Sequence, residues 1–217
     1  MVALEKLDKD AEKMNRSNDP IDKSLVINTV IGAAEDAAEH NIYNLDLKLD
    51  NIMVDDSRKS SKGNWKVIDW DMAVAGDLKR HKGAIGTEGY MPPEMIAYLL
   101  NENTHVNWTI DRAVVWTIGM LVFYLMIGEY AGKVTTEMKV YSKRVLRTPV
   151  KSQSDPIWYW VYLMLAYSKN EDIPGKLFPE EIRKDDDIKD VIDWFEHVLC
   201  KEDDRWTLQE LLAKSKF

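Results

Sequence analysis

The chain has 217 residues, 45% of them hydrophobic and 30% charged, which suits one soluble globular domain with a real core. Its net charge of −8 argues against nucleic acid as the main partner, because phosphate backbones require a basic surface. Nucleotide binding through a metal ion is still compatible with this charge. Cys200 is the single cysteine, so an intramolecular disulfide is excluded and a reducing compartment, cytoplasmic or nuclear, is expected.

No membrane association is expected from the apolar segments. The N-terminal stretch "MVALEKLDKD" is charged from residue 5 onward and lacks the apolar core of a signal peptide. The longest apolar run, residues 113–128, is shorter than the roughly 20 residues that cross a bilayer. It is therefore expected to be a buried helix at the centre of the domain.

The N-terminal part predicts two helices. Residues 1–23 read as one short helix that ends in a polar loop. Ser24 is a plausible N-cap for a second helix that runs to about His40. Its apolar residues recur at helical spacing and share one face: Val26, Val30, Ala33 and Ala37.

Two short apolar runs, residues 51–54 and 65–68, flank a polar linker and predict a small β-hairpin. Residues 69–94 carry no helical period and predict a long loop, which in a compact domain is usually functional. The remainder is helical, with helices expected over residues 113–128, 156–167 and 187–199 and at the C-terminus. The predicted fold is mainly α with one small β-hairpin.

Three motifs occur in order along this framework. They read "DLKLDN" at residues 46–51, "DWD" at 69–71 and "GTEGYMPPE" at 86–94. Each alone is compatible with an ordinary polar or glycine-containing turn. Together their order and separations match the catalytic loop, the metal motif and the end of the activation segment of protein kinases.

The chain thus resembles the eukaryotic-type protein kinase family, over that family's C-terminal lobe only. The resemblance assigns residues 44–51 to the catalytic loop, 69–71 to the metal motif and 69–94 to the activation segment, in one domain of residues 1–217. It implies transfer of a phosphoryl group from ATP, with Mg²⁺, to the hydroxyl groups of a protein substrate.

The resemblance also implies roles for individual residues. Asp46 corresponds to the residue that accepts the substrate proton, and Lys48 to the lysine of serine/threonine kinases that neutralises the transferred phosphate. Asn51 and Asp69 correspond to the ligands of Mg²⁺ and so to the cofactor-binding residues. The remaining matches tie the structure together: Thr87 links the substrate loop to the catalytic loop, and Glu94 pairs with Arg205.

The chain departs from the family pattern at several places. Asn44 and Leu45 replace the His-Arg pair before the catalytic Asp, which makes switching by phosphorylation of the activation segment doubtful. Asp71 replaces the glycine of the metal motif. Val114 stands where a central helix normally supplies an Asp to support the catalytic loop, and Asp111 is the nearest carboxylate to replace it.

The N-terminal lobe is expected to be missing. Only 45 residues precede Asp46, and no Gly-rich loop, no V-A-I-K strand and no helix carrying the paired Glu is expected to fit there. ATP binding by the chain alone is therefore expected to be weak. The hairpin face should lose its usual neighbour and expose Met53 and Trp65, so we expect it to bind a protein partner, either a kinase N-lobe or a second copy of the chain.

Three hypotheses follow for the function. The first is a serine/threonine protein kinase that works when a partner or a longer parent chain supplies the N-lobe. The second is a truncated pseudokinase that binds another kinase, or its substrate, and inhibits or scaffolds it. The third is a degenerate fragment with no function.

Overall fold

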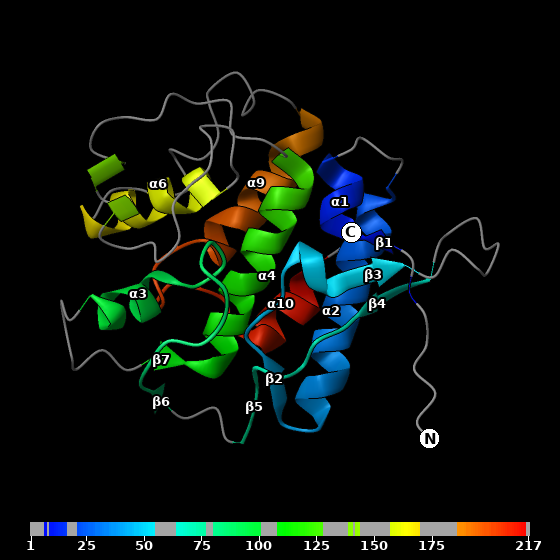
Figure 1. Cartoon of the computed structure of the whole chain (residues 1–217), viewed down its shortest axis with the longest axis horizontal. Helices are drawn as coiled ribbons and strands as arrows, with labels where there is room; N and C mark the ends of the chain where they lie inside the picture. Colours follow the sequence, from blue (N-terminus) through cyan, green and yellow to red (C-terminus); the bar gives the residue numbers. More distant parts are fainter. Residues whose placement is uncertain are drawn as a thin grey trace.

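A computed structural model describes residue 7 and residues 9–16, 21–54, 64–76, 80–100, 108–127, 139–140, 142–143, 157–169 and 186–215. Helices dominate these residues, and the strands are short (Figure 1). The helices are α1 (Ala11–Arg16), α2 (Lys23–Glu39), α3 (Pro93–Leu99), α4 (Ile110–Ile127), α6 (Ile157–Ser168), α9 (Asp186–Val198) and α10 (Leu208–Lys214), with the 3-10 turn η1 (Leu49–Asn51). The strands are β1 (Lys9–Asp10), β2 (Ile42–Asn44), β3 (Ile52–Val54), β4 (Trp65–Val67), β5 (Ala73–Ala75), β6 (Arg80–His81) and β7 (Trp108–Thr109).

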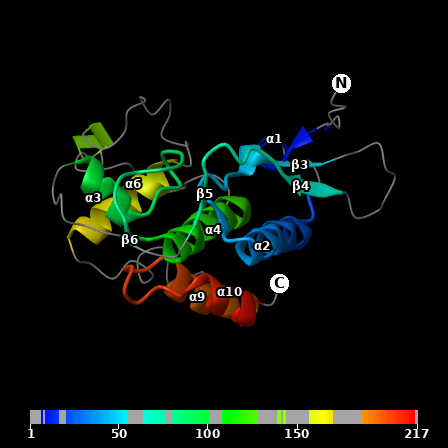
Figure 2. The same ribbon diagram turned by 90° about the horizontal axis from the view of Figure 1, so that it is seen from below.

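Helix α4 forms the centre of the core, as its apolar sequence predicts. Every residue from 113 to 125 is buried, so no face of this stretch meets water. Figures 1 and 2 show the other elements arranged around it, with α2 on one side, α3 and α6 on the opposite side, and α9 and α10 on another. Within the described part of the chain, no helix has the length and apolar character needed to cross a membrane.

Helix α2 packs against α4 and leads through β2 into the catalytic loop. The N-cap is Asp22 rather than the predicted Ser24, because the Asp22 carboxylate accepts the N–H of Leu25 at 3.0 Å. Its buried face also differs slightly from the predicted one: Val26, Ile27, Val30 and Ala34 are the buried residues. The helix ends at Glu39, close to the predicted boundary.

The predicted hairpin is present, and it has a third strand. Strands β3 and β4 pair antiparallel with Val54 opposite Trp65, while β1 pairs with the free edge of β3. The short helix α1 follows β1 and lies against β3 and η1. The prediction that Trp65 lies exposed is wrong: its side chain is 8% exposed, and Met53 is half-buried.

The segment predicted as one long loop contains two short strands. Strand β5 pairs antiparallel with β2 and places Asn44 opposite Ala73. Strand β6 pairs with β7, next to the start of α4. These pairings attach both halves of residues 69–94 to the helical body, and a two- or three-residue strand gives too short an apolar pattern to be recognised in the sequence.

The C-terminal helices cover the remaining side of α4. Helix α10 begins with a capping box in which Thr207 and Glu210 exchange side-chain and backbone hydrogen bonds. Gly119 of α4 lies directly under Val198 and Leu199 at the end of α9, where a side chain would collide with both. The resulting helical body, together with the small sheets, has the arrangement expected of a kinase-like fold.

Candidate functional site

The catalytic loop connects β2 to β3, and its leucines anchor it. Leu45, Leu47 and Leu49 are each 3% exposed or less and belong to the core. Burial of these three leucine side chains in the core therefore fixes the backbone of the loop. The polar side chains between them then occupy set positions, and Asp46 itself is only 3% exposed.

Asp46, Lys48 and Thr87 form one hydrogen-bonded cluster. The Lys48 ammonium donates to Oδ2 of Asp46 and to Oγ1 of Thr87, both at 2.8 Å. The Thr87 hydroxyl in turn donates to Oδ1 of Asp46 at 2.5 Å. Both carboxylate oxygens are thus held by charge-assisted or short hydrogen bonds, and the activation segment is joined to the catalytic loop at the residue predicted to be the base.

Asn51 lies at the other end of the same loop. Its side-chain amide nitrogen donates to the backbone oxygen of Asp46 at 3.1 Å and reaches Oδ2 of Asp46 at 3.4 Å. Its backbone oxygen accepts the N–H of Ile68, the residue before Asp69, at 2.8 Å. Asn51 is therefore adjacent in space to both predicted functional aspartates, and its amide oxygen is the remaining side-chain acceptor.

Asp69 has an unusual backbone conformation. Its φ of +59° lies in the left-handed region, which costs energy for a residue with a side chain. The carboxylate is exposed, whereas the backbone oxygen accepts a hydrogen bond from the side chain of Asn44 at 3.2 Å. Strain of this kind persists where surrounding contacts enforce it, and it is frequent at functional sites.

The activation segment approaches the catalytic loop closely at Gly86. Its φ is +111°, and a Cβ at this position would stand 2.5 Å from the backbone oxygen of Leu45. Only glycine fits both the conformation and the contact. This approach brings Thr87 within reach of Asp46.

Three side chains of the helical body hold the backbone of the activation segment. The indole nitrogens of Trp108 and Trp160 donate to the carbonyl oxygens of Gly83 at 2.9 Å and Met91 at 2.7 Å. The Tyr124 hydroxyl donates to the oxygen of Gly89 at 2.8 Å. The segment is thus attached to α4, α6 and β7. Leu45 is buried where the family pattern has Arg.

Glu94 and Arg205 form the predicted ion pair. Two hydrogen bonds, of 2.6 and 3.2 Å, join their side chains, and both residues are buried. Burial lowers the pKa of the Arg205 guanidinium, but the Glu94 carboxylate, together with Cys200 and Glu202, raises this pKa overall. The pair fixes α3, at the end of the activation segment, to the loop before α10.

All seven predicted site residues therefore fall into two groups. The first group is hydrogen-bonded together and consists of Asp46, Lys48, Asn51 and Thr87. Asp69 is linked to this group by hydrogen bonds of Ile68 and Asn44. The second group is the ion pair of Glu94 and Arg205, which lies away from the first. Asn44 is the residue that sequence reasoning treated only as a departure from the family. Its role in linking the two loops has no sequence signal, because it depends on backbone groups that no motif encodes.

The oxygen atoms of Asn51 and Asp69 fit a Mg²⁺ ion only when a nucleotide supplies further oxygen ligands. Among the described residues, no group of three His, Cys, Asp or Glu side chains gathers as a protein-only metal site. The Asn51 amide oxygen and the Asp69 carboxylate are hard oxygen donors of the type that Mg²⁺ takes one or two at a time, together with water and phosphate oxygens. Two protein ligands are what a nucleotide-bound magnesium requires, so the residues present fit such an ion.

Comparison with known proteins agrees with this geometry. The family model of the protein kinase domain matches residues 4–217, which is nearly the whole chain. The chain belongs to the protein kinase family. Its kinase-type fold and the order of its loops follow from that membership, and the family in general uses ATP and Mg²⁺.

Several curated serine/threonine kinases are similar to parts of this protein kinase chain. CBL-interacting protein kinase 20 of Oryza sativa subsp. japonica is 29% identical over 52% of the chain and 24% of its own length. Serine/threonine-protein kinase 33 of Mus musculus is 29% identical over 62% of the chain and 27% of its own length. A probable serine/threonine-protein kinase, FMP48, of Saccharomyces cerevisiae is 26% identical over 83% of the chain. The chain matches half the length of this yeast relative and about a quarter of the other two.

Proposed function

We propose that this chain is the catalytic half of a serine/threonine protein kinase and transfers phosphate from Mg²⁺–ATP to protein hydroxyls once an N-lobe is supplied. The observation that carries the proposal is the cluster of Asp46, Lys48 and Thr87, closed by hydrogen bonds of 2.5–2.8 Å. A degenerate fragment has no physical need to keep this geometry around a carboxylate that is 3% exposed.

The residues of the cluster divide the chemistry among them. Asp46 accepts the proton of the substrate hydroxyl, and Thr87 and Lys48 hold its carboxylate in the orientation that this transfer needs. Lys48 also supplies the positive charge that offsets charge on the transferred group. When Mg²⁺ is bound with ATP, Asn51 and Asp69 hold it, and the ion supplies neutralisation of the phosphate oxygens.

The proposal also requires that an N-lobe cover the ATP site. The one glycine before Asp46 is Gly32, within helix α2, so residues 1–45 hold no Gly-rich phosphate loop. We propose that a partner chain, or a longer polypeptide of which this chain is part, covers the site and contacts the hairpin. Part of that surface is already shielded by β1 and α1, and Met53 and Val67 are half-buried apolar residues of the hairpin.

The surface contact has its own test. Met53→Glu should reduce binding of a partner at the hairpin, while Val140→Glu, at an exposed apolar residue 57% accessible in the described structure, serves as a matched control. The readout is the mass of the chain in solution, with and without added kinase N-lobe. The proposal of a partner at this face is contradicted if the wild type stays monomeric, binds no N-lobe and has the same mass in solution as both variants.

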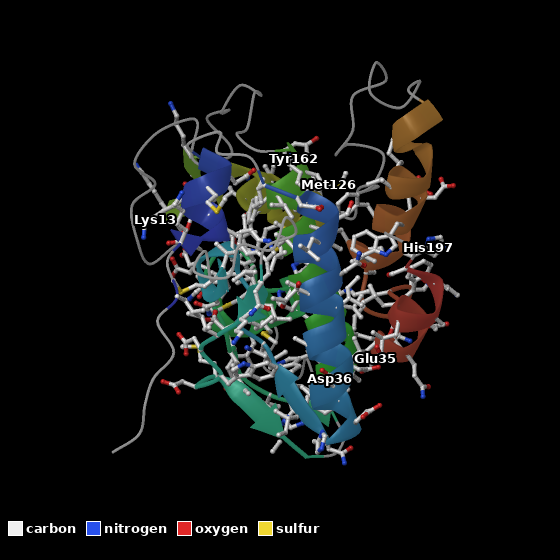
Figure 3. All side chains as sticks on the ribbon, turned by 90° about the vertical axis from the view of Figure 1, so that its right-hand side faces the viewer. Lys13, Glu35, Asp36, Met126, Tyr162 and His197 are labelled. Carbon is white, nitrogen blue, oxygen red and sulfur yellow. The ribbon has the colours of Figure 1, made fainter. Side chains whose placement is uncertain are left out.

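The catalytic proposal is tested with the chain purified from cells that express it, together with whatever it binds. Phosphate incorporation from labelled ATP into a mixed protein substrate is compared for wild type, Asp46→Asn and Asp36→Asn. Asp36 is an exposed carboxylate of α2, on a different element from the catalytic loop (Figure 3), so its variant controls for the change in charge. Analysis of the labelled amino acids separates serine and threonine from tyrosine.

Each outcome has a distinct meaning. Incorporation on serine or threonine that is lost in Asp46→Asn and kept in Asp36→Asn supports the kinase. Incorporation that persists in Asp46→Asn comes from a bound kinase and supports the alternative, a pseudokinase that scaffolds or inhibits another enzyme. This alternative draws on the replacements at Leu45, Asp71 and Val114.

A further inference from the structure

Asn44 is a buried polar residue whose side chain touches two functional loops at once. It lies at the end of β2 and is 3% exposed. Its amide oxygen accepts the backbone N–H of Asp46 at 2.8 Å, and its amide nitrogen donates to the backbone oxygen of Asp69 at 3.2 Å. Twenty-five positions of sequence separate Asn44 from Asp69, so this is a tertiary link.

The chemistry of the two contacts requires an amide. The Asp46 N–H can only donate and the Asp69 carbonyl can only accept, so a bridge between them must accept at one end and donate at the other. This also fixes which end of the Asn44 side chain carries the oxygen. A carboxylate could make only the first contact, and an aliphatic side chain could make neither.

The backbone of Asn44 is itself held in place. It pairs with Ala73 of β5, four residues after Asp69, so one strand pair anchors both ends of the bridge. Val114 of α4, where the family pattern has a carboxylate, is an apolar residue 1% exposed and offers the loop no hydrogen bond. The buried Asp46 N–H would therefore lack a partner without Asn44, at a cost typical of buried orphaned groups.

We propose that Asn44 is a positioning residue that sets Asp69 relative to Asp46, and so presents the metal-binding carboxylate to the site. It does this through the hydrogen bond to the Asp69 carbonyl, which supports the left-handed backbone conformation at φ +59°. The metal-related part of this inference rests on the proposed function. The bridge itself does not.

Two variants separate the two halves of the bridge. At pH 8, Asn44→Asp retains an acceptor for the Asp46 N–H and loses the donor to Asp69, whereas Asn44→Leu loses both. Tyr43→Phe is the matched control, because Tyr43 is the neighbouring buried residue of β2, 5% exposed, and its ring sits outside the bridge. Each protein is studied as the whole chain by NMR.

Three readouts are measured. Hydrogen exchange of the Asp46 amide should accelerate about tenfold in Asn44→Leu, in line with loss of one hydrogen bond, and stay slow in Asn44→Asp. The ¹⁵N shift of Trp70, whose peptide contains the Asp69 carbonyl, should move in both variants. The Mn²⁺ concentration that half-broadens the signals of the metal motif should rise about tenfold in both, as for loss of other groups that orient metal ligands.

The outcomes are separable. Unchanged Trp70 shift and Mn²⁺ response in Asn44→Asp would overturn the proposal, as would changes of equal size in Tyr43→Phe. If Asn44→Leu does not fold, Asn44→Asp alone decides. If wild type shows no Mn²⁺ broadening, the proposed metal site fails, while amide exchange and the Trp70 shift still decide whether the bridge exists.

Discussion

Arg205 lies 111 positions after Glu94 in sequence, yet its guanidinium binds that carboxylate through two hydrogen bonds of 2.6 and 3.2 Å. The same guanidinium donates to the backbone oxygens of Arg112 and Cys200 and packs 4.8 Å from the ring of Trp116. Arg205 thereby connects the end of the activation segment, the central helix and the C-terminal segment.

Arg205→Ala should therefore destabilise the whole domain. Removing one member of a buried ion pair typically costs about 3–5 kcal/mol, because the other charge is left without compensation. The measurement is the free energy of unfolding in urea. The control is Lys214→Ala, whose pair with Glu210 spans 3.9 Å between half-exposed side chains and should change stability by less than about 1 kcal/mol. Equal effects of the two substitutions would contradict a structural role for the buried pair.

Gly86→Ala should separate the activation segment from the catalytic loop. Gly83 provides a matched control, since its φ of +110° equals that of Gly86 within a degree, but a Cβ there would meet nothing within 4 Å. Both alanine variants must hold a side chain at a positive φ, which costs about 1–3 kcal/mol. Only Gly86→Ala adds the collision with the Leu45 oxygen. We expect Gly86→Ala to lose more free energy of unfolding than Gly83→Ala. We also expect only Gly86→Ala to lose the proposed phosphate transfer.

Binding of Mg²⁺–ATP by the isolated chain should be weak. Residues 1–45 contain no Gly-rich loop and no V-A-I-K sequence, so the phosphates lack most of their usual contacts. Isothermal titration that gave a dissociation constant in the low micromolar range would contradict this expectation. Residual binding should decrease when Asn51 or Asp69 is replaced by alanine, and should remain when the exposed Asp36 is replaced.

Cys200 should react slowly with thiol reagents in the folded chain. Its side chain is 8% exposed, and burial raises the pKa of the thiol from 9.0 to about 11. The thiolate, which is the reactive form, is then about a hundredfold scarcer than in an exposed cysteine at neutral pH. Labelling with iodoacetamide should follow global unfolding and accelerate with urea. Rapid labelling without denaturant would show that the segment around Cys200 opens locally.

The sequence predicted the elements with long apolar patterns. Helix α4 was expected because its run of apolar residues has no polar face, and the hairpin because two apolar stretches flank a polar turn. Short strands such as β1 and β6 were not predicted, since two residues give no periodicity. Asp22 rather than Ser24 caps α2 because the local backbone brings the Asp22 carboxylate to the Leu25 N–H, a choice between neighbouring candidates that spacing cannot make.

The candidate site was predictable where side chains define it. Asp46, Lys48 and Thr87 were found through motif spacing, and they lie together in the structure. Asn44 was not predicted as part of the site, since its partners are backbone groups of two loops. Burial of Trp65 was missed for a similar reason: β1 and α1 cover the hairpin through strand pairing, which composition alone does not reveal.

The most direct test of the central claim joins an N-lobe covalently to this chain. The N-lobe of an active serine/threonine kinase is fused ahead of this chain, and the initial rate of phosphate transfer from Mg²⁺–ATP to a protein substrate is measured. The fusion with Asp46→Asn is the reference, and equal urea stability of the two fusions shows that both are folded. Our account predicts a rate on serine and threonine that falls at least a hundredfold in the Asp46→Asn fusion, in line with the about 10²–10⁴-fold contribution of general base catalysis. Equal rates in two folded fusions that bind Mg²⁺–ATP would show that Asp46 is not a catalytic base and would contradict the assignment of this site to phosphate transfer.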